Sequence, residues 1–406
     1  MKKIPSLILL FTLALASCAT PTPPAPVPVT PTFAPPTPAP STPTPVGCGS
    51  IDDHSSDQVY PPYVSYTDVG IPDFSKPAYL VSTTDPAFGA EIIRITDAAV
   101  FGENNVRHGY SKDQAWNCDQ TLIKINGNRI LDGGTYQFLR FLDMPNEPKW
   151  SHLDPNKLFG ISGNKFVSMN AATGVSTTLH TFTGYSEIFM GPWEGNISTD
   201  DASVAFITSE VSGGDIIVYD ILHDVVVAVK SVASLGYDGT IDWVSVSQSG
   251  NFVVINGSGS SDNSVKSYDR NLNPIATLFS QGEHADLCYD TYGNETLVSV
   301  GDPGQMARLD NGQQTTIFDF DGLFWGHVSC RNYKRPGWAY VSLHNGDVMA
   351  IKLDGSQTVE RFAHHRSSES IYEAEAQSAP NPNGTKIMYA SDWNGTAEIN
   401  SYVAGQ

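Results

Sequence analysis

AQSAPNPNGTKIMYASDW, residues 376–393, is the stretch that decides the fold, because its layout returns along the chain. A short strand-like segment leads into a polar turn of Asn, Pro and Gly, and an apolar run rich in β-forming residues follows. Six earlier segments share this layout: AWNCDQTLIKI (115–125), SHLDPNKLFGI (151–161), NISTDDASVAFIT (196–208), VSVSQSGNFVVI (244–255), ADLCYDTYGNETLVSV (285–300) and VSCRNYKRPGWAYVSL (328–343). The copies begin about 35 to 50 residues apart, so the chain is a repeat protein.

Seven copies at this spacing predict an all-β fold, a seven-bladed β-propeller of four-stranded blades. Several copies continue into further strands, as in DIIVYDILHDVVVAVK (215–230) and DVMAIKLDGSQTVERF (347–362). The last copy is short of a strand, and YLVSTTDPAFGAEIIRIT (79–96) offers a strand pair before the first copy. We expect this N-terminal pair to complete the seventh blade and close the ring, which removes exposed sheet edges. A β-sandwich pair is the alternative architecture.

The turn-centred copies, and APNPNGTKIMYASDW (379–393) most clearly, resemble the propeller repeats of periplasmic TolB-type proteins and of oligogalacturonate lyase. The resemblance covers the chain from Tyr79 to its C-terminus and concerns the fold. Propellers carry binding proteins, scaffolds, hydrolases and lyases, so the function depends on the site.

The N-terminus has the features of an export signal. Lys2 and Lys3 precede an apolar stretch, residues 4–16, that is too short to span a bilayer. It ends in Leu-Ala-Ser-Cys at Cys18, which resembles the lipobox of bacterial lipoproteins. The resemblance implies cleavage before Cys18, lipidation of that residue, and an exported protein anchored by lipid to the outer face of a membrane of the cell envelope. An ordinary secretory signal is the alternative.

These features predict four segments: a signal peptide (1–17), the lipidated Cys with a linker rich in Pro and Thr (18–47), an extended lead-in (48–78) and the propeller (79–406). The linker is uncharged from Thr20 to Val46 and cannot bury a core, so we expect a disordered stalk. The net charge of −20 argues against nucleic acid as a partner. We expect a monomer whose contact with the membrane is made through the lipid alone.

Four further cysteines follow the linker: Cys48, Cys118, Cys288 and Cys330. An exported protein can form disulfides, but the pairing cannot be read from the spacing. For Cys288 and Cys330, buried free thiols are the preferred interpretation. A disulfide between the two on adjacent inner strands comes next, and a zinc site with nearby histidines third.

Residues just before the innermost strand of each propeller blade surround the mouth of the central channel. Polar and aromatic side chains gather at these positions, and some of them suit glycan chemistry. Aromatic rings stack on sugars, and imidazoles and carboxylates transfer protons or bind metals. The candidates for stacking on a substrate are Trp150, Trp193, Trp243 and Trp325. The alternative is that such residues simply suit any channel mouth.

His284 and His327 precede neighbouring innermost strands, and Glu375 and Gln377 precede the next one. Such a cluster suits a divalent cation, which would be Ca, Mn or Zn. Oligogalacturonate lyases are similar in placing a His/Gln metal site at this face. Their closely spaced Gln-x-x-His-x-His run is absent near Gln377.

The segment RHGYSKDQAWN (107–117) places Arg107, His108 and Tyr110 together, and Arg331 adds a second cation. These residue types resemble the active sites of propeller-type ulvan and rhamnose–glucuronate lyases. The resemblance implies a His and Tyr acid–base pair and an Arg that neutralises the uronate carboxylate.

The sequence has no G-x-S-x-G, H-E-x-x-H, P-loop or dinucleotide-binding motif. We therefore expect a uronate polysaccharide or oligosaccharide lyase of the cell envelope. A non-catalytic propeller that binds a glycan or a protein is the alternative.

Overall fold

The computed structural model describes residues 48, 69–209, 213–238, 240–259, 262–282, 284–301, 303–319 and 325–405. The predicted signal peptide, the predicted linker with Cys18, and residues 49–68 of the lead-in lie outside the described residues.

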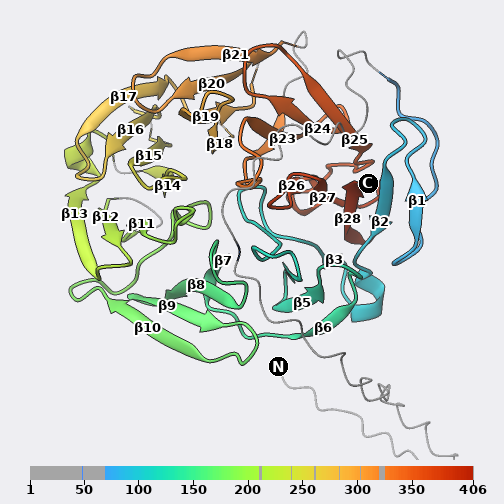
Figure 1. Cartoon of the computed structure of the whole chain (residues 1–406), viewed down its shortest axis with the longest axis horizontal. Coiled ribbons are helices and arrows are strands. Elements are labelled where there is room, and N and C mark those ends of the chain that lie inside the picture. Colours follow the sequence, from blue (N-terminus) through green and yellow to red (C-terminus); the bar gives the residue numbers. More distant parts are fainter. Residues whose placement is uncertain are drawn as a thin grey trace, which may run out of the picture. The chain divides into compact units, whose positions relative to one another are not determined.

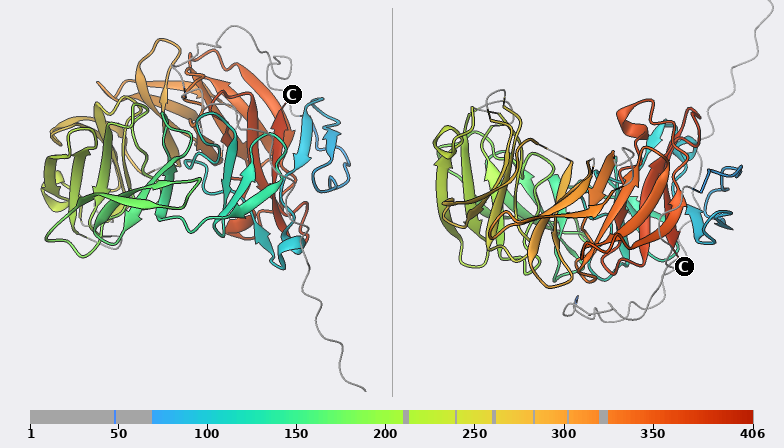
Figure 2. Two further views of the ribbon diagram at one scale, coloured as in Figure 1. Left: turned by 60° about the horizontal axis from the view of Figure 1, so that its bottom comes forward. Right: turned by 90° about the horizontal axis from the view of Figure 1, so that it is seen from above.

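The described chain forms seven β-sheets arranged around a central axis (Figure 1). Within each repeat, successive strands pair antiparallel and lead from the axis to the rim. This arrangement confirms the predicted seven-bladed propeller. Figure 2 shows the same sheets from two further directions, with each blade standing beside its neighbours.

Four blades have four strands each, numbered from the axis outward. Blade 2 contains β7 (Asn146–Trp150), β8 (Lys157–Ser162), β9 (Lys165–Asn170) and β10 (Ser176–Thr181). Blade 4 contains β14 (Ile241–Val246), β15 (Phe252–Gly257), β16 (Val265–Asp269) and β17 (Pro274–Phe279). Blade 5 contains β18 (Ala285–Tyr289), β19 (Glu295–Ser299), β20 (Gly304–Arg308) and β21 (Gln314–Phe318). Blade 6 contains β22 (Gly326–Ser329), β23 (Trp338–Leu343), β24 (Asp347–Lys352) and β25 (Val359–His364).

Two blades have three regular strands, and a single β-bridge stands in place of the innermost one. Blade 1 contains β4 (Leu122–Ile125), β5 (Arg129–Asp132) and β6 (Phe138–Phe141), with the bridge between Trp116 and Ile123. Blade 3 contains β11 (Ser203–Ile207), β12 (Asp215–Asp220) and β13 (Val225–Ser231), with the bridge between Phe189 and Ile207.

Blade 7 joins the two ends of the described chain. Its C-terminal strands are β26 (Ala379–Pro380), β27 (Lys386–Ser391) and β28 (Ile399–Gly405). Strand β2 (Glu91–Arg94) pairs antiparallel with β28, and β1 (Ser82–Thr84) pairs with β2. Strand β3 (Asn105–Val106) pairs with β28 in parallel. The N-terminal pair therefore completes the seventh blade, as the sequence predicts.

Helical structure is limited to three short 3-10 turns in the described part of the chain, Ala98–Phe101, Ala233–Leu235 and Tyr372–Ala374. Among the same residues, no helix is long and apolar enough to cross a membrane.

The repeated turn owes its shape to one side chain and one glycine. In blade 7, Oδ1 of Asn381 accepts hydrogen bonds from the backbone N–H groups of Thr385 and Lys386, both at 2.9 Å. Gly384 has a φ of +66°, and a Cβ there would meet the Tyr340 hydroxyl at 2.3 Å. In blade 7 the turn from Asn381 to Gly384 thus reverses the chain between two strands, because Asn381 caps the turn and the positive φ favours Gly384.

The hydrophobic core lies between neighbouring blades. Val218 of blade 3, for example, belongs to the same buried cluster as Val244 and Ile255 of blade 4. Each sheet therefore buries both faces against its neighbours, so its strands are apolar runs rather than strictly alternating ones.

All four described cysteines form disulfides. Cys48 is bonded to Cys118 of blade 1, and Cys288 to Cys330. The preferred interpretation of Cys288 and Cys330 as free thiols is therefore wrong, and the alternative of a disulfide between these two is correct. Cys288 and Cys330 lie on or just after the innermost strands of neighbouring blades, which brings their Cα atoms to 5.3 Å.

Strand direction divides the propeller into two faces. The chain reaches each innermost strand at one face, as at His284 before β18, and we call this the mouth face. It leaves the innermost strand at the opposite face, which carries the repeated turns and which we call the turn face. For example, six residues of extended chain lead from His327 at the mouth face to Tyr333 at the turn face. Such a segment is about 20 Å long, so one blade presents different side chains to the two faces.

Candidate functional site

Three aromatic rings from three blades form a continuous row at the mouth face. The ring of Tyr110, which precedes blade 1, meets the ring of His327 edge-on, with 5.3 Å between centroids. His327 stacks on His284 of blade 5 at 4.8 Å, with 21° between the planes. Three of the predicted site residues are therefore brought together.

His327 lies at the centre of this row and is 3% exposed. Its Nε2 atom lies 3.4 Å from Oε2 of Glu375 and has no hydrogen-bond partner among the described residues. Burial lowers the pKa of His327 to about 3, and the neighbouring His284 acts in the same direction. The imidazole is therefore neutral near neutral pH, and its buried Nε2 makes no hydrogen bond although it lies near the carboxylate of Glu375.

Tyr110 has the opposite protonation preference. Burial raises its pKa well above the ordinary value of a phenol, and the negative charges of Glu194 and Asp242 add to the effect. The hydroxyl therefore keeps its proton. A neutral imidazole and a protonated phenol side by side form a potential base and acid.

Arg107 supplies a cation close to these two groups. It is 8% exposed, and its Nη1 donates a 2.6 Å hydrogen bond to Oε1 of Gln377. Burial lowers the pKa of Arg107, and its charge in turn acts on His327. Among the described residues, no carboxylate lies within ion-pair distance of this guanidinium. Such a charge is costly to bury, so an anionic ligand would bind here favourably.

Backbone geometry fixes the partner of Arg107. Gln377 is fully buried and has a φ of +43°, which is unusual for a residue with a side chain. Its backbone carbonyl lies 2.9 Å from Nε2 of His108. The amide that holds Arg107 is therefore itself held in one position.

A second charged group borders the row. Nζ of Lys112 lies 2.6 Å from Oε2 of Glu194 and 3.8 Å from the centre of the Trp243 ring. Lys112 is thus paired internally.

Asp242 lies near the same group. It accepts a 2.8 Å hydrogen bond from Asn256. Partial desolvation raises the pKa of Asp242, and the charge of Glu194 adds to this effect.

Two pockets flank the row of rings. The larger, about 450 Å³, is lined by residues that include Asp242, His284, Trp325 and His344. The smaller, about 230 Å³, is lined by residues that include Tyr110 and Trp193. The indole rings of Trp193 and Trp325 are exposed, at 57% and 56%.

His344 in the larger pocket is bonded through Nδ1 to Glu369. This hydrogen bond raises the pKa of His344, so the imidazole is more readily protonated than an ordinary one. The larger pocket therefore combines the aromatic surface of Trp325 with the polar side chains of Asp242, His284 and His344.

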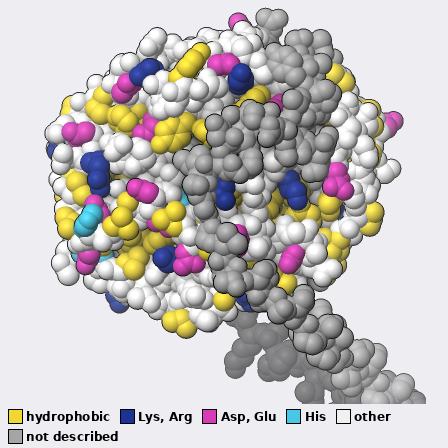
Figure 3. Space-filling model, viewed as in Figure 1, with side chains coloured by type: hydrophobic (Ala, Val, Ile, Leu, Met, Phe, Trp, Pro, Cys, Tyr) yellow, Lys and Arg dark blue, Asp and Glu magenta, His cyan; other side chains and the backbone are white. Residues whose placement is uncertain are grey.

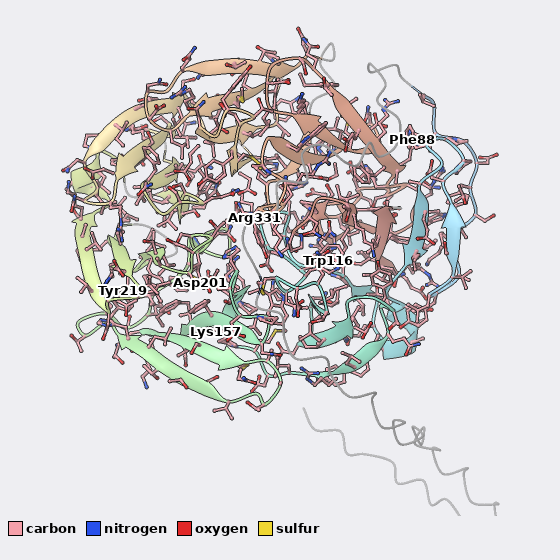
Figure 4. The ribbon with its side chains drawn as sticks, in the orientation of Figure 1. Phe88, Trp116, Lys157, Asp201, Tyr219 and Arg331 are labelled. Atoms are coloured by element: carbon pink, nitrogen blue, oxygen red, sulfur yellow. A yellow bond between two sulfur atoms is a disulfide. The ribbon has the colours of Figure 1, made fainter. Side chains whose placement is uncertain are left out.

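Two residues predicted to be catalytic, His108 and Arg331, bind other groups of the protein instead. His108 is 1% exposed, and its ring nitrogens lie 3.0 Å from Oγ of Ser401 and 2.9 Å from the carbonyl of Gln377. Arg331 forms a buried two-point salt bridge with Asp286, with distances of 2.9 and 3.1 Å. Figure 4 shows Arg331 near the axis of the ring. Because it follows the end of β22, it lies beyond reach of the mouth face. We therefore give both residues structural roles.

Two of the four predicted stacking residues are buried. Trp150 is 4% exposed and donates from Nε1 to the carbonyl of Ala115. Trp243 is 1% exposed and lies beneath Lys112. Both rings pack between blades, so neither can stack on a substrate.

The predicted metal ligands do not converge on one point. The rings of His284 and His327 are stacked and nearly parallel. Their nitrogen lone pairs lie in the ring planes, so they do not point toward a common ion between the rings. The side-chain oxygen of Gln377 is occupied by Arg107. Within the described residues, no three His, Cys, Asp or Glu side chains are grouped as metal ligands. These residues do not fit a divalent cation as they lie.

Three residues of the site were missed in the sequence analysis: Lys112, His344 and Tyr372. Lys112 belongs to the same RHGYSK run as Tyr110, which was a usable signal. Tyr372 acts electrostatically on Arg107 and lies in a 3-10 turn that no repeat position marks. His344 follows the second strand of blade 6, so it does not share the position before an innermost strand that marks the other candidates.

No protein-family model matches the chain, and no curated protein matches its sequence. Among solved structures, an oligogalacturonate lyase in complex with manganese is similar with a TM-score of 0.60 and 12% identity, covering 80% of this chain and 95% of that one. An oligogalacturonate lyase from Vibrio parahaemolyticus has a TM-score of 0.57 and 11% identity, with coverages of 80% and 96%. The resemblance predicted from the repeats is confirmed for the fold, and at this identity for the fold alone.

Proposed function

We propose that the mouth face binds a uronate-containing oligosaccharide and cleaves it by β-elimination. The observation that carries the proposal is Arg107, a nearly buried guanidinium without a carboxylate partner among the described residues. It lies within electrostatic reach of His327, a neutral imidazole, and the protonated phenol of Tyr110 belongs to the same row of rings. The oligogalacturonate lyases named above share the fold, which is compatible with the proposal.

The first role is that of Arg107. The C5 proton of a uronate is weakly acidic because the anion formed on its loss lies beside a carboxylate. An arginine bound to that carboxylate neutralises it and stabilises the developing charge.

The two rings then exchange protons with the substrate. His327 takes the C5 proton, the electron pair left behind forms the C4=C5 double bond, and the C4–O bond to the neighbouring sugar breaks. Tyr110 gives its proton to the departing oxygen. The carboxylate of the substrate raises the pKa of His327 toward the range in which a general base is effective.

A glycan-binding propeller without chemistry is the second candidate. The exposed rings of Trp193 and Trp325 favour it, since both suit stacking on sugars whether or not a bond is broken.

The test is to mix the purified protein with uronate oligosaccharides and follow the ultraviolet absorbance of the unsaturated product. Arg107→Ala should lose both binding and product, since the carboxylate loses its partner. Arg308→Ala, which removes an exposed arginine paired with Asp310, should behave as wild type. Binding by wild type without product would support the second candidate, and no binding at all would contradict both.

We also propose that the protein is exported and anchored through a lipid on Cys18. The disulfides Cys48–Cys118 and Cys288–Cys330 support export, because such bonds persist in oxidising compartments.

A further inference from the structure

Trp193 has a backbone conformation that side chains other than glycine rarely adopt. Its φ is +62°, and its ring is 57% exposed. Such a conformation is unfavourable and persists only where its surroundings enforce it.

Two charged side chains of β7 hold the backbone of Trp193 on both sides. The N–H of Trp193 donates to Oε1 of Glu147, and its carbonyl accepts a 2.8 Å hydrogen bond from Nζ of Lys149. Glu147 is 2% exposed and has a φ of +50°. Its second oxygen accepts from the N–H of Met190. A buried carboxylate and a buried ammonium thus fix one peptide segment.

The loop that bears Trp193 is also fixed by close backbone packing. It reads Gly191-Pro-Trp-Glu-Gly195, and a Cβ on either glycine would meet the carbonyl of Val244 within 2.7 Å. The carbonyl of Gly191 accepts from the N–H of Val244 at 2.9 Å, and Gly195 donates to Met190 at 2.8 Å. The indole is therefore presented on a rigid support, which limits the entropy lost when a ligand stacks on it.

The pocket beside this ring adjoins the proposed site. Tyr110 lines it together with Trp193, and the same Tyr110 ring touches His327. Its polar lining includes Lys124 and Lys149, both 5% exposed, and Asp113, to which both are paired. The pocket of about 230 Å³ is smaller than the 300–1,000 Å³ of common ligand sites, so it suits a single sugar ring.

We infer that Trp193 and the pocket beside it form a subsite for one pyranose ring of the glycan, adjacent to the sugar that reacts. The indole covers the apolar face of the ring, and the paired lysines and Asp113 offer hydrogen bonds to its hydroxyls. This inference rests on the proposed function, because it places the substrate relative to Arg107 and His327. It adds which residues hold the neighbouring sugar.

The experiment measures the binding of uronate oligosaccharides of increasing length by isothermal calorimetry. We expect Trp193→Ala to weaken binding of a trisaccharide about tenfold, the loss of one stacking contact, and to leave a single uronic acid unaffected. Trp193→Phe should retain most of the affinity. Tyr292→Ala is the matched control, because Tyr292 is 77% exposed and lies in the β18–β19 turn at the opposite face.

Fluorescence gives a second readout for the same protein. Binding of the trisaccharide should change the emission of wild type more than that of Trp193→Phe, in which Trp325 is the remaining exposed indole near the site. Equal trisaccharide affinity in wild type and Trp193→Ala would overturn the subsite. A third outcome separates the two proposals. If binding increases with glycan length in wild type but not in Trp193→Ala, and wild type forms no unsaturated product, the subsite is supported and the lyase reaction is contradicted.

Discussion

At the scale of single residues, burial decides which histidines can react. His108 and His327 are both buried and both have a pKa lowered to about 3, yet their surroundings differ. Both nitrogens of His108 lie within hydrogen-bond distance of the protein, whereas Nε2 of His327 has no such partner in the described structure. His108 is therefore a structural residue and His327 a candidate base, although the sequence analysis predicted both as site residues at the channel mouth.

The lowered pKa of His108 has a consequence for stability. Between the ordinary value of 6.5 and about 3, the unfolded chain binds a proton at this residue that the folded chain does not. The free energy of unfolding should therefore fall as the pH falls through this range, by up to about 1.4 kcal/mol per pH unit. In His108→Gln, urea unfolding should show a shallower pH dependence than in wild type.

Loss of its hydrogen bonds will also make His108→Gln less stable near neutral pH, so the slope with pH is the quantity to compare. His223→Gln serves as the control, since His223 has a 75% exposed side chain in a turn. An identical slope in wild type and His108→Gln would contradict the structural role of His108.

At the scale of strands and loops, the sequence predicts architecture better than side-chain direction. The polar turn after the innermost strand is local chemistry, so it marks every blade, with a glycine in blades 4 to 7. The missing strand of the last copy reveals the ring closure by β2. The side to which a residue points depends on strand register, and one residue of shift reverses it. This explains why the prediction that Trp150 and Trp243 face the substrate is wrong.

The candidate site is predictable only in part for the same reason. Tyr110, His284 and His327 can be found because they lie before or at the start of innermost strands. Trp193 can be found by residue type. The hydrogen bonds of Glu147 and Lys149 to its backbone cannot, because the partners lie 46 and 44 residues apart in the sequence. Pairings over such distances, including both disulfides, are fixed by the folded ring and leave no local signal in the sequence.

Ring closure gives a prediction at this scale. Deleting residues 1–78 removes Phe74, whose carbonyl accepts from Nε1 of Trp393, but it leaves β1 and β2. We expect a cooperative fold that is less stable by about 1–3 kcal/mol. Deleting residues 1–96 also removes β2 and exposes the edge of β28, so we expect aggregation and loss of cooperative unfolding.

Both deletions also remove the disulfide of Cys48, so the reference is the full chain with Cys48→Ser and Cys118→Ser. Thermal unfolding followed by circular dichroism makes the comparison. Equal behaviour of the two deletions would show that β2 does not close the ring.

At the scale of the whole molecule, the charge and the proposed anchor set the context of the site. The net charge is −20, yet Lys and Arg side chains are interspersed with Asp and Glu on the face visible in Figure 3. An acidic surface disfavours anionic ligands at long range, so Arg107 has to act locally. Added salt should therefore strengthen the first encounter with a uronate glycan by screening repulsion.

The proposed anchor is tested in cells. Cys18→Ser should move the protein from the membrane fraction to the soluble fraction after export, because the lipid is the proposed attachment. Immunoblots of the two fractions measure this. An exported Cys18→Ser protein that stays with the membrane would contradict lipid anchoring.

The central claim is that the row of Tyr110, His327 and His284 beside Arg107 performs β-elimination on a uronate. The most direct measurement is the ultraviolet absorbance of unsaturated product from uronate oligosaccharides, with binding measured in parallel. We predict product with wild type, and for His327→Ala and Tyr110→Phe at least about a hundredfold loss of rate, the usual contribution of a general acid or base. Binding by both variants should stay within a few fold of wild type. Wild-type protein that binds these glycans without forming a double bond, or variants that form it at the wild-type rate, would contradict the account.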